Sequence, residues 1–154
     1  LEKACIVLLG DISPSVAVAL IEQADKHRSK QLIEKCFEVI DAETDGALSA
    51  DSLTRLTKES LKRVVERSQL SPSDEIMIFR AVCAWAEAEC ARQGDNSPTP
   101  EKKRQVLGDV FNAVRFPTMS VEEFGEVGRC KLINCKFFLK LPHYLFGSII
   151  SIVK

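Results

Sequence analysis

One segment, from Ser73 to Gln93, limits most strongly how this chain can fold. Its apolar residues recur at three- and four-residue spacing, which predicts a helix. One face carries Ile76, Phe79, Cys83, Ala86 and Cys90, and Ile78, Val82 and Trp85 widen the apolar arc. A helix that is apolar over so wide an arc packs on several sides. We therefore expect this helix to be the central element of an all-helical fold, ending at Gly94.

Hydroxyl side chains next to prolines mark further helix starts. The pairs Ser13-Pro14, Ser71-Pro72 and Thr99-Pro100 each place a capping hydroxyl before a proline at the first helical position. Ser120 and Glu123 have the spacing of a capping box. The chain is therefore expected to begin a helix at each of these positions.

The same dipeptides are also the kind of site that proline-directed kinases modify. For Ser13-Pro14, Ser71-Pro72 and Thr99-Pro100 the helix cap is the better interpretation. Ser97-Pro98 falls in the expected loop 94–98, so it is the better candidate for phosphorylation.

Shorter apolar stripes predict the remaining helices. They lie near residues 17–24, 32–40, 61–65 and 100–113, with a short element at 53–56. Residues 115–119 are expected to be extended, because Pro117 disfavours helix at the residue before it. No segment alternates long enough to indicate a sheet, and short loops favour antiparallel neighbours. We expect an all-α stack of antiparallel helical hairpins.

Charge and aromatic content argue against two classes of partner. Lysine plus arginine is 21 and aspartate plus glutamate is 22, for a net charge of −1, and only 6% of residues are aromatic. Such a chain lacks the positive electrostatic field that attracts nucleic acid or an anionic membrane. It also lacks the aromatic surface on which bases stack. The uncharged stretch 141–153 is shorter than the roughly 20 apolar residues of a spanning helix. No nucleic-acid or membrane partner is expected.

The cysteines are dispersed along the chain. They are Cys5, Cys36, Cys83, Cys90, Cys130 and Cys135. Cys83 and Cys90 share a helix face but lie about 10.5 Å apart along its axis, beyond the roughly 7 Å Cα limit of a disulfide. We expect reduced, buried cysteines in an intracellular protein.

Residues 41–52 mimic a calcium-binding loop between two predicted helices. Oxygen-bearing side chains fall at its first, third, fifth and ninth positions, and Gly46 falls at the sixth. The twelfth position is Ser52, where a bidentate Glu is needed. A calcium-responsive helical module with a degenerate EF-hand-like loop is the alternative to an acidic turn between helices.

The sequence contains few residues that indicate zinc binding or catalysis. Cys130, Cys135 and His143 are residue types that bind zinc, but a structural zinc needs four ligands and no fourth is evident. The sequence has no Gly-rich phosphate loop, no nucleophile elbow and no Cys/His pair with an obvious orienting acid. We expect no catalytic residue, no metal and no cofactor.

Several motifs follow one another in a specific order. They are Leu61, residues 64–65, residues 70–75, Phe79, Val82, Trp85, Glu89, Arg104, Leu107, residues 114–117 and residues 119–124. In this order and spacing they resemble the BACK domain, which follows the BTB domain in BTB–kelch proteins and their relatives. The tracts 38–42 and 84–94 are similar to the BTB–BACK–PHR subfamily, which includes BTB/POZ domain-containing proteins 3 and 6. The resemblance covers about residues 1–129 and implies a BACK-like stack of hairpins.

The resemblance implies a non-catalytic adaptor or scaffold role in a cullin-3 ubiquitin ligase. In this family the BTB domain dimerises and docks the cullin. The first BACK helix pair, the 3-box, completes a groove for the N-terminal extension of the cullin. The 3-box would span residues 13–40 of a BACK domain at residues 12–129. Its cullin-binding candidates are Val16, Leu20, Ile21 and Ala24.

The resemblance also implies what lies outside the BACK domain. Residues 1–11 look like the last helix of a BTB domain. The rest of that domain, through which family members form homodimers, is missing, and so is any kelch or PHR domain that would bind protein substrates. Residues 130–154 are basic and apolar and match nothing in the family. We therefore expect a fragment of a longer, cytoplasmic ubiquitination protein, which by itself binds cullin-3 weakly.

Overall fold

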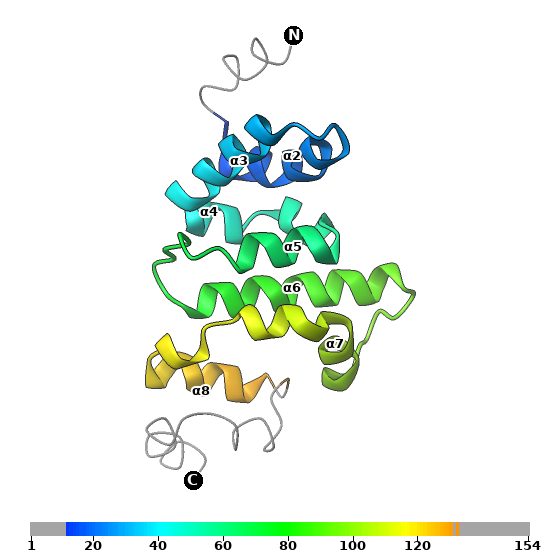
Figure 1. Ribbon diagram of the computed structural model, residues 1–154. Coiled ribbons are helices and arrows are strands. Elements are labelled where there is room, and N and C mark those ends of the chain that lie inside the picture. The colour runs from blue at the N-terminus through cyan, green and yellow to red at the C-terminus, as the bar shows by residue number, and fades with distance from the viewer. Residues whose placement is uncertain (1–11, 131, 133–154) are drawn as a thin grey trace. The chain divides into compact units, whose positions relative to one another are not determined.

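The computed structural model describes residues 12–130 and 132, and every regular element among them is helical (Figure 1). The elements are α2 (Pro14–Lys26), α3 (Lys30–Ala42), α4 (Thr44–Leu48), η1 (Asp51–Arg55), α5 (Lys58–Val65), α6 (Ile76–Arg92), α7 (Pro100–Leu107), η2 (Gly108–Ala113), η3 (Phe116–Thr118) and α8 (Val121–Arg129), where η denotes a 3₁₀ helix. The prediction of an all-α fold is confirmed. The expected BTB helix at residues 1–11 and nearly all of the tail 130–154 lie outside the described residues.

The chain divides between Ser73 and Asp74 into two compact units. The first contains α2 to α5 and the second contains α6 to α8. A helical hairpin organises each unit: α2 packs against α3 in the first, and α6 packs against α7 in the second (Figure 1). The predicted hairpins are thus present within each unit.

The core of the first unit lies between α2 and α3. Its buried apolar residues include Ala17, Val18, Ile21 and Ala24 from α2, with Cys36, Phe37 and Ile40 from α3. Each helix begins at a serine: the Ser13 hydroxyl accepts from the Val16 N–H, and the Ser29 hydroxyl accepts from the Leu32 N–H, both at 3.4 Å. The cap at Ser13 and the proline after it confirm the prediction. The sequence analysis missed the cap at Ser29.

Polar side chains tie α5 to α2. The Glu22 carboxylate accepts from the backbone N–H of Thr57, the N-cap residue of α5. Further along the same two helices, Arg63 Nη1 lies 2.5 Å from Asp25 Oδ2. The N–H groups at a helix start have no partner within the helix. Glu22 of α2 supplies a hydrogen-bond acceptor at the start of α5.

Helix α6 has the wide apolar arc that the sequence predicted. Its buried residues are Ile76, Ile78, Phe79, Ala81, Val82, Trp85, Ala86 and Cys90, and Trp85 is only 2% exposed. The helix starts later than predicted, however, at Ile76. Ser71-Pro72 is not its cap, because the backbone there is bound elsewhere: the Ser71 N–H donates to Thr44 Oγ1 at 3.2 Å and the Ser73 N–H donates to Asp45 Oδ1 at 2.9 Å.

One carboxylate serves the N-termini of both α6 and α8. Glu123 Oε2 accepts from the Ser120 N–H at 2.6 Å, which completes the predicted capping box of α8. Glu123 Oε1 accepts from the Ile76 N–H of α6 at 2.9 Å. Glu75, the N-cap residue of α6, makes no side-chain cap. Helix α6 is therefore capped by α8, far along the chain.

Two further predictions, for residues 115–119 and 100–113, are wrong, and a cluster of phenylalanines lies in these segments. Phe116 is 3% exposed, and its ring centroid lies 6.2 Å from that of Phe79, 5.2 Å from that of Phe111 and 6.4 Å from that of Phe124. The segment expected to be extended turns at η3 instead, which brings Phe116 inward. The helix expected over 100–113 breaks at Gly108, whose φ of 54° ends α7 before η2 begins.

Substitution of Phe116 tests this cluster. We expect Phe116→Ala to lower the free energy of unfolding by about 3–5 kcal/mol, because it empties a buried aromatic site that neighbouring rings cannot refill. Phe116→Leu keeps more of the volume and should cost less. Urea denaturation of both variants measures the difference. Wild-type stability in Phe116→Ala would contradict the packing.

The double cap by Glu123 predicts a pH-dependent stability. The hydrogen bond from the Ser120 backbone lowers the pKa of Glu123, and the Ile76 N–H contributes in the same direction. A carboxyl with a lowered folded-state pKa stabilises the protein above its unfolded pKa of about 4.3, and this contribution is lost as the pH falls through the folded value. Glu123→Gln should therefore lower stability at pH 7 by about 1 kcal/mol, the usual value of a cap.

The deficit of Glu123→Gln relative to the wild type should shrink as the pH falls below about 4.3. Denaturant titrations between neutral and acid pH measure it. Glu122→Gln is the matched control, since Glu122 is the exposed neighbour on the same turn. An equal loss of stability at all pH values would contradict a role for the Glu123 charge.

Candidate partner-binding surface

The structure separates the four candidate residues of α2 into two kinds. Val16 is 45% exposed and Leu20 is half-buried. Ile21 and Ala24 have no exposed surface at all and belong to the core against α3. Only Val16 and Leu20 therefore present apolar surface outward.

The outward face of α2 carries a short apolar stripe. Ala19 and Leu20 lie three and four residues after Val16, so both share a face with it, and Gln23 continues that face. Val16 and Ala19 are exposed. Polar residues usually occupy the solvent face of an amphipathic helix, so this stripe is a candidate contact surface.

A groove opens where α2 begins. It is lined by Ile12, Ser13, Pro14, Lys35, Glu38, Val39, Ala42 and Glu43, and its volume is about 560 Å³. Ile12, Pro14, Val39 and Ala42 supply apolar surface, while the Lys35–Glu38 ion pair at 3.2 Å stands among the lining residues. Such a groove suits one apolar side chain of an extended peptide, with charged groups at its edge. The sequence analysis missed Ile12 and Val39.

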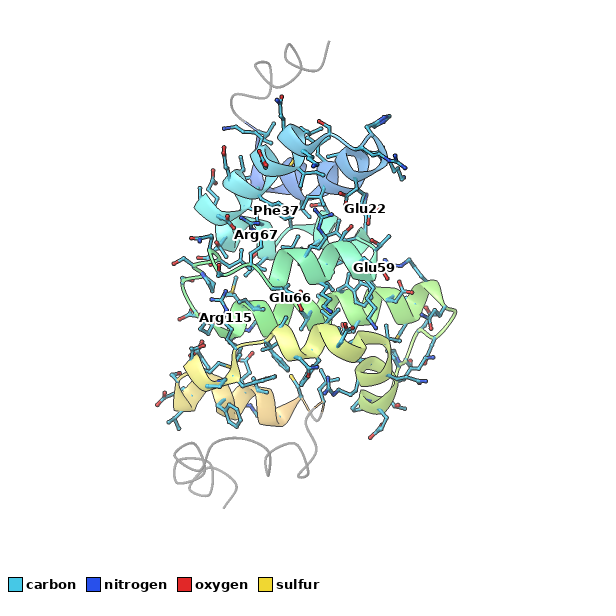
Figure 2. All side chains as sticks on the ribbon, in the orientation of Figure 1. Glu22, Phe37, Glu59, Glu66, Arg67 and Arg115 are labelled. Atoms are coloured by element: carbon cyan, nitrogen blue, oxygen red, sulfur yellow. The ribbon has the colours of Figure 1, made fainter. Side chains whose placement is uncertain are left out.

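Arg67 holds the end of α3 in place. Its guanidinium binds Asp41 through two nitrogens, Nε to Oδ1 at 2.8 Å and Nη2 to Oδ2 at 2.5 Å. Its Cζ also lies 4.2 Å from the ring centroid of Phe37. Both side chains are labelled in Figure 2. The hydrogen bond to Asp41 raises the pKa of Arg67. This fork fixes the helix that forms one wall of the groove.

The segment 41–52 does not have the geometry of a calcium loop. Residues 44–48 form α4, and Gly46 lies inside this helix rather than at a sharp turn. Asp41, the first expected ligand, is bound to Arg67, and Asp45, the fifth position, accepts from the Ser73 N–H. Thr44 Oγ1 donates to the carbonyl oxygens of Ile40 and Asp41. The acidic residues here serve the packing of the first unit.

The other sequence hypotheses can be placed only in part. Cys130 is exposed, whereas Cys135 and His143 lie outside the described residues. Within residues 12–130 and 132, no group of three His, Cys, Asp or Glu side chains is arranged to hold a metal ion. Burial raises the pKa of the Cys36 thiol to about 11 and that of Cys83 to about 12, which keeps both protonated at neutral pH. No helix among the described residues has the length and apolar character to cross a membrane.

Comparisons with known proteins identify the family. The BACK family model, "BTB And C-terminal Kelch", matches residues 17–128. BTB/POZ domain-containing protein 6 of Mus musculus and that of Homo sapiens are each 39% identical over 125 residues, 80% of this chain and 23% of the relative. BTB/POZ domain-containing protein 3 of Homo sapiens is 34% identical over 125 residues, 80% of this chain and 24% of that protein.

These matches cover most of this chain but less than a quarter of each relative's length. No solved structure matches the chain significantly. The family match begins within α2 and ends within α8, so it includes both compact units. The chain therefore belongs to the BACK domain family.

Proposed function

We propose that this chain is the BACK part of a non-catalytic adaptor for a cullin-3 ubiquitin ligase. Its α2–α3 hairpin would act as the 3-box and receive the N-terminal extension of the cullin. The observation that carries the proposal is the outward apolar stripe on α2, formed by the exposed Val16 and Ala19 and the half-buried Leu20. It lies on the first helix pair of the domain, the pair that we propose as the 3-box.

The stripe is better suited to a partner than to solvent. Single exposed apolar residues are common on protein surfaces, but here the exposed Val16 and Ala19 share one helix face with the half-buried Leu20. Burying Val16 and Leu20 against an apolar side chain of the cullin would remove both from water, which favours binding. Ile21 and Ala24 would act indirectly, by holding α2 against α3.

The groove at Ile12, Pro14 and Val39 offers a second contact for the same extension. Its apolar lining accepts a side chain, and Lys35 and Glu38 can hydrogen-bond the backbone or polar groups that flank it. Stripe and groove both involve α2, so a single extended peptide could engage them together.

Binding by this chain alone is expected to be weak. In the family the BTB domain docks the cullin and the 3-box only completes the groove, so the surface contributed here would fall below the roughly 1,200–2,000 Å² of a stable interface. Dimerisation through a BTB domain and capture of protein substrates would belong to other domains of the longer protein. The role proposed for this domain is to position those parts in the assembled ligase.

Charge substitutions on α2 test the proposal. Val16→Asp and Leu20→Asp should each weaken binding to the purified N-terminal region of cullin-3 by at least about tenfold, because each buries an unpaired carboxylate in an apolar contact. Val16 lies in the first turn of α2, where an acidic residue is favoured, so Val16→Asp should fold normally. Isothermal titration calorimetry measures the affinity and circular dichroism checks the fold.

The chain provides a matched control in Val121→Asp. Val121 is 41% exposed against 45% for Val16, and it also lies in the first turn of a helix, α8. Val121→Asp should bind cullin-3 as the wild type does. A folded Val16→Asp chain with wild-type affinity, or equal losses in Val16→Asp and Val121→Asp, would contradict the assignment of the α2 stripe.

A further inference from the structure

The loop 93–99 between α6 and α7 contains an exposed serine followed by proline. Ser97 is exposed, and its backbone N–H donates only locally, to Asp95 Oδ1 at 3.1 Å. Gly94, with a φ of 88°, ends α6 and starts the loop. The backbone around Ser97-Pro98 is therefore outside both helices, and an enzyme can reach the hydroxyl.

Two of the other hydroxyl–proline pairs are occupied as helix caps. The Ser13 hydroxyl accepts from the Val16 N–H at 3.4 Å, and the Thr99 hydroxyl accepts from the Lys102 N–H at 3.2 Å. The prolines that follow are the first residues of α2 and α7. Protein kinases act on extended substrate segments, so each of these sites would have to lose its cap and its first helical turn.

Ser71-Pro72 is exposed but held by its backbone. The Ser71 N–H donates to Thr44 Oγ1 and the Ser73 N–H donates to Asp45 Oδ1. The segment cannot lift away without breaking these two bonds on either side of the proline. At Ser97 the backbone bond stays within the loop itself, to Asp95 Oδ1, so the loop can move without breaking a contact to another helix. Asp95 and Glu87 lie near Ser97, but the Lys103 ammonium group lines the same hollow and offsets their negative charge.

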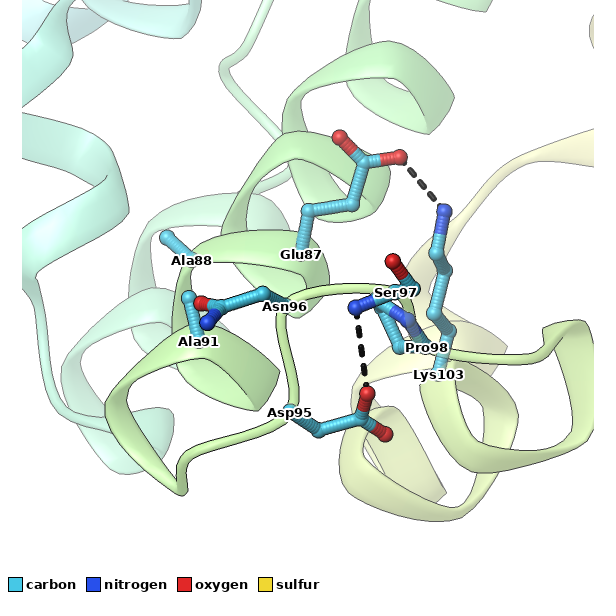
Figure 3. Close-up of a pocket in the computed structure, with 8 residues that line it drawn as sticks. All are labelled: Glu87, Ala88, Ala91, Asp95, Asn96, Ser97, Pro98 and Lys103. Carbon is cyan, nitrogen blue, oxygen red and sulfur yellow. Dashed lines mark hydrogen bonds and ion pairs between the residues drawn. The ribbon is translucent and has the colours of Figure 1, made fainter.

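Ser97 shares a hollow with a lysine. The hollow has a volume of about 620 Å³ and is lined by Glu87, Ala88, Ala91, Asp95, Asn96, Ser97, Pro98 and Lys103. Figure 3 shows these residues. Lys103 extends across the hollow to Glu87, with 2.5 Å between Nζ and Oε1. A phosphate on Ser97 would compete with Glu87 for this ammonium group, because it carries up to two negative charges.

From this placement we propose that Ser97 is a phosphorylation site for a proline-directed serine/threonine kinase, and that Lys103 binds the resulting phosphate. In the reaction, Ser97 Oγ attacks the γ-phosphorus of Mg·ATP and forms the new O–P bond. The bond from the γ-phosphorus to the bridging oxygen breaks, ADP leaves, and the hydroxyl proton passes to the carboxylate base of the kinase. The modification would change the charge of the α6–α7 hairpin in the second unit, whereas the α2 stripe belongs to the first unit.

Site-resolved phosphorylation of the whole chain tests the assignment. The chain is incubated with a purified proline-directed kinase and Mg·ATP, and the phosphorylated peptides are quantified over time by mass spectrometry. Ser97 should be modified at least about fivefold faster than Ser13 or Thr99, since each of these must first give up a helix cap. Ser71 should also react more slowly than Ser97.

Two variants make the result decisive. Ser97→Ala should remove the fast phase, and Pro98→Ala, which keeps the serine, should remove most of it while leaving the thermal unfolding temperature unchanged. Modification of Ser13, Ser71 or Thr99 at the rate of Ser97, or unchanged labelling of Ser97 in Pro98→Ala, would overturn the assignment of the site.

The role of Lys103 has its own readout. A neighbouring ammonium group favours the doubly charged phosphate, so it should lower the second pKa of phosphoserine below its usual value of about 6. A ³¹P NMR titration of the phosphorylated chain and of its Lys103→Met variant should show a lower value in the former. Identical titration curves would overturn the assignment of Lys103 as the phosphate ligand.

Discussion

Helix α6 buries apolar side chains around most of its circumference, and other segments of the second unit cover part of this apolar surface. Helices α7 and α8 pack against α6, and Phe79 of α6 meets Phe111 and Phe116 edge to face. Helix α8 is joined to the start of α6 by a hydrogen bond in which the Glu123 carboxylate accepts from the Ile76 N–H. Apolar burial thus supplies most of the stabilisation, and two carboxylates of α8, Glu123 and Glu126, help to fix how α8 meets α6.

In the first unit, α2 packs against α3 and binds α5, and one apolar stripe of α2 still faces outward. Glu22 and Asp25 on α2 bind Thr57 and Arg63, so the polar side of α2 is used to hold α5. The buried residues Ile21 and Ala24 hold α3. The stripe at Val16, Ala19 and Leu20 is what remains. Helix α2 therefore has separate faces for core packing, for polar ties and for the partner proposed above.

Local signals in the sequence predicted much of the fold, and the errors arose where distant groups intervene. Helical periodicity predicted α6, and the hydroxyl–proline rule succeeded at Pro14 and Pro100. The same rule was wrong at Ser71-Pro72, because Thr44 and Asp45 bind the backbone there.

The spacing of apolar residues on α2 predicted an apolar arc, but only packing against α3 decides that Ile21 faces inward. Ile12 and Val39 meet in one groove from separate segments, which no local pattern indicates. Gly46 matches the calcium-loop pattern in the sequence, but its role in the structure is to permit close packing. A Cβ at this position would lie 3.1 Å from Pro14 Cγ, so glycine lets α4 approach the start of α2. Ser52, where a calcium loop needs Glu, donates instead to the Ser15 carbonyl at 2.8 Å. An evolutionary path from this segment to a calcium sensor would have to give up contacts of α2 with α4 and η1 before it gained a ligand.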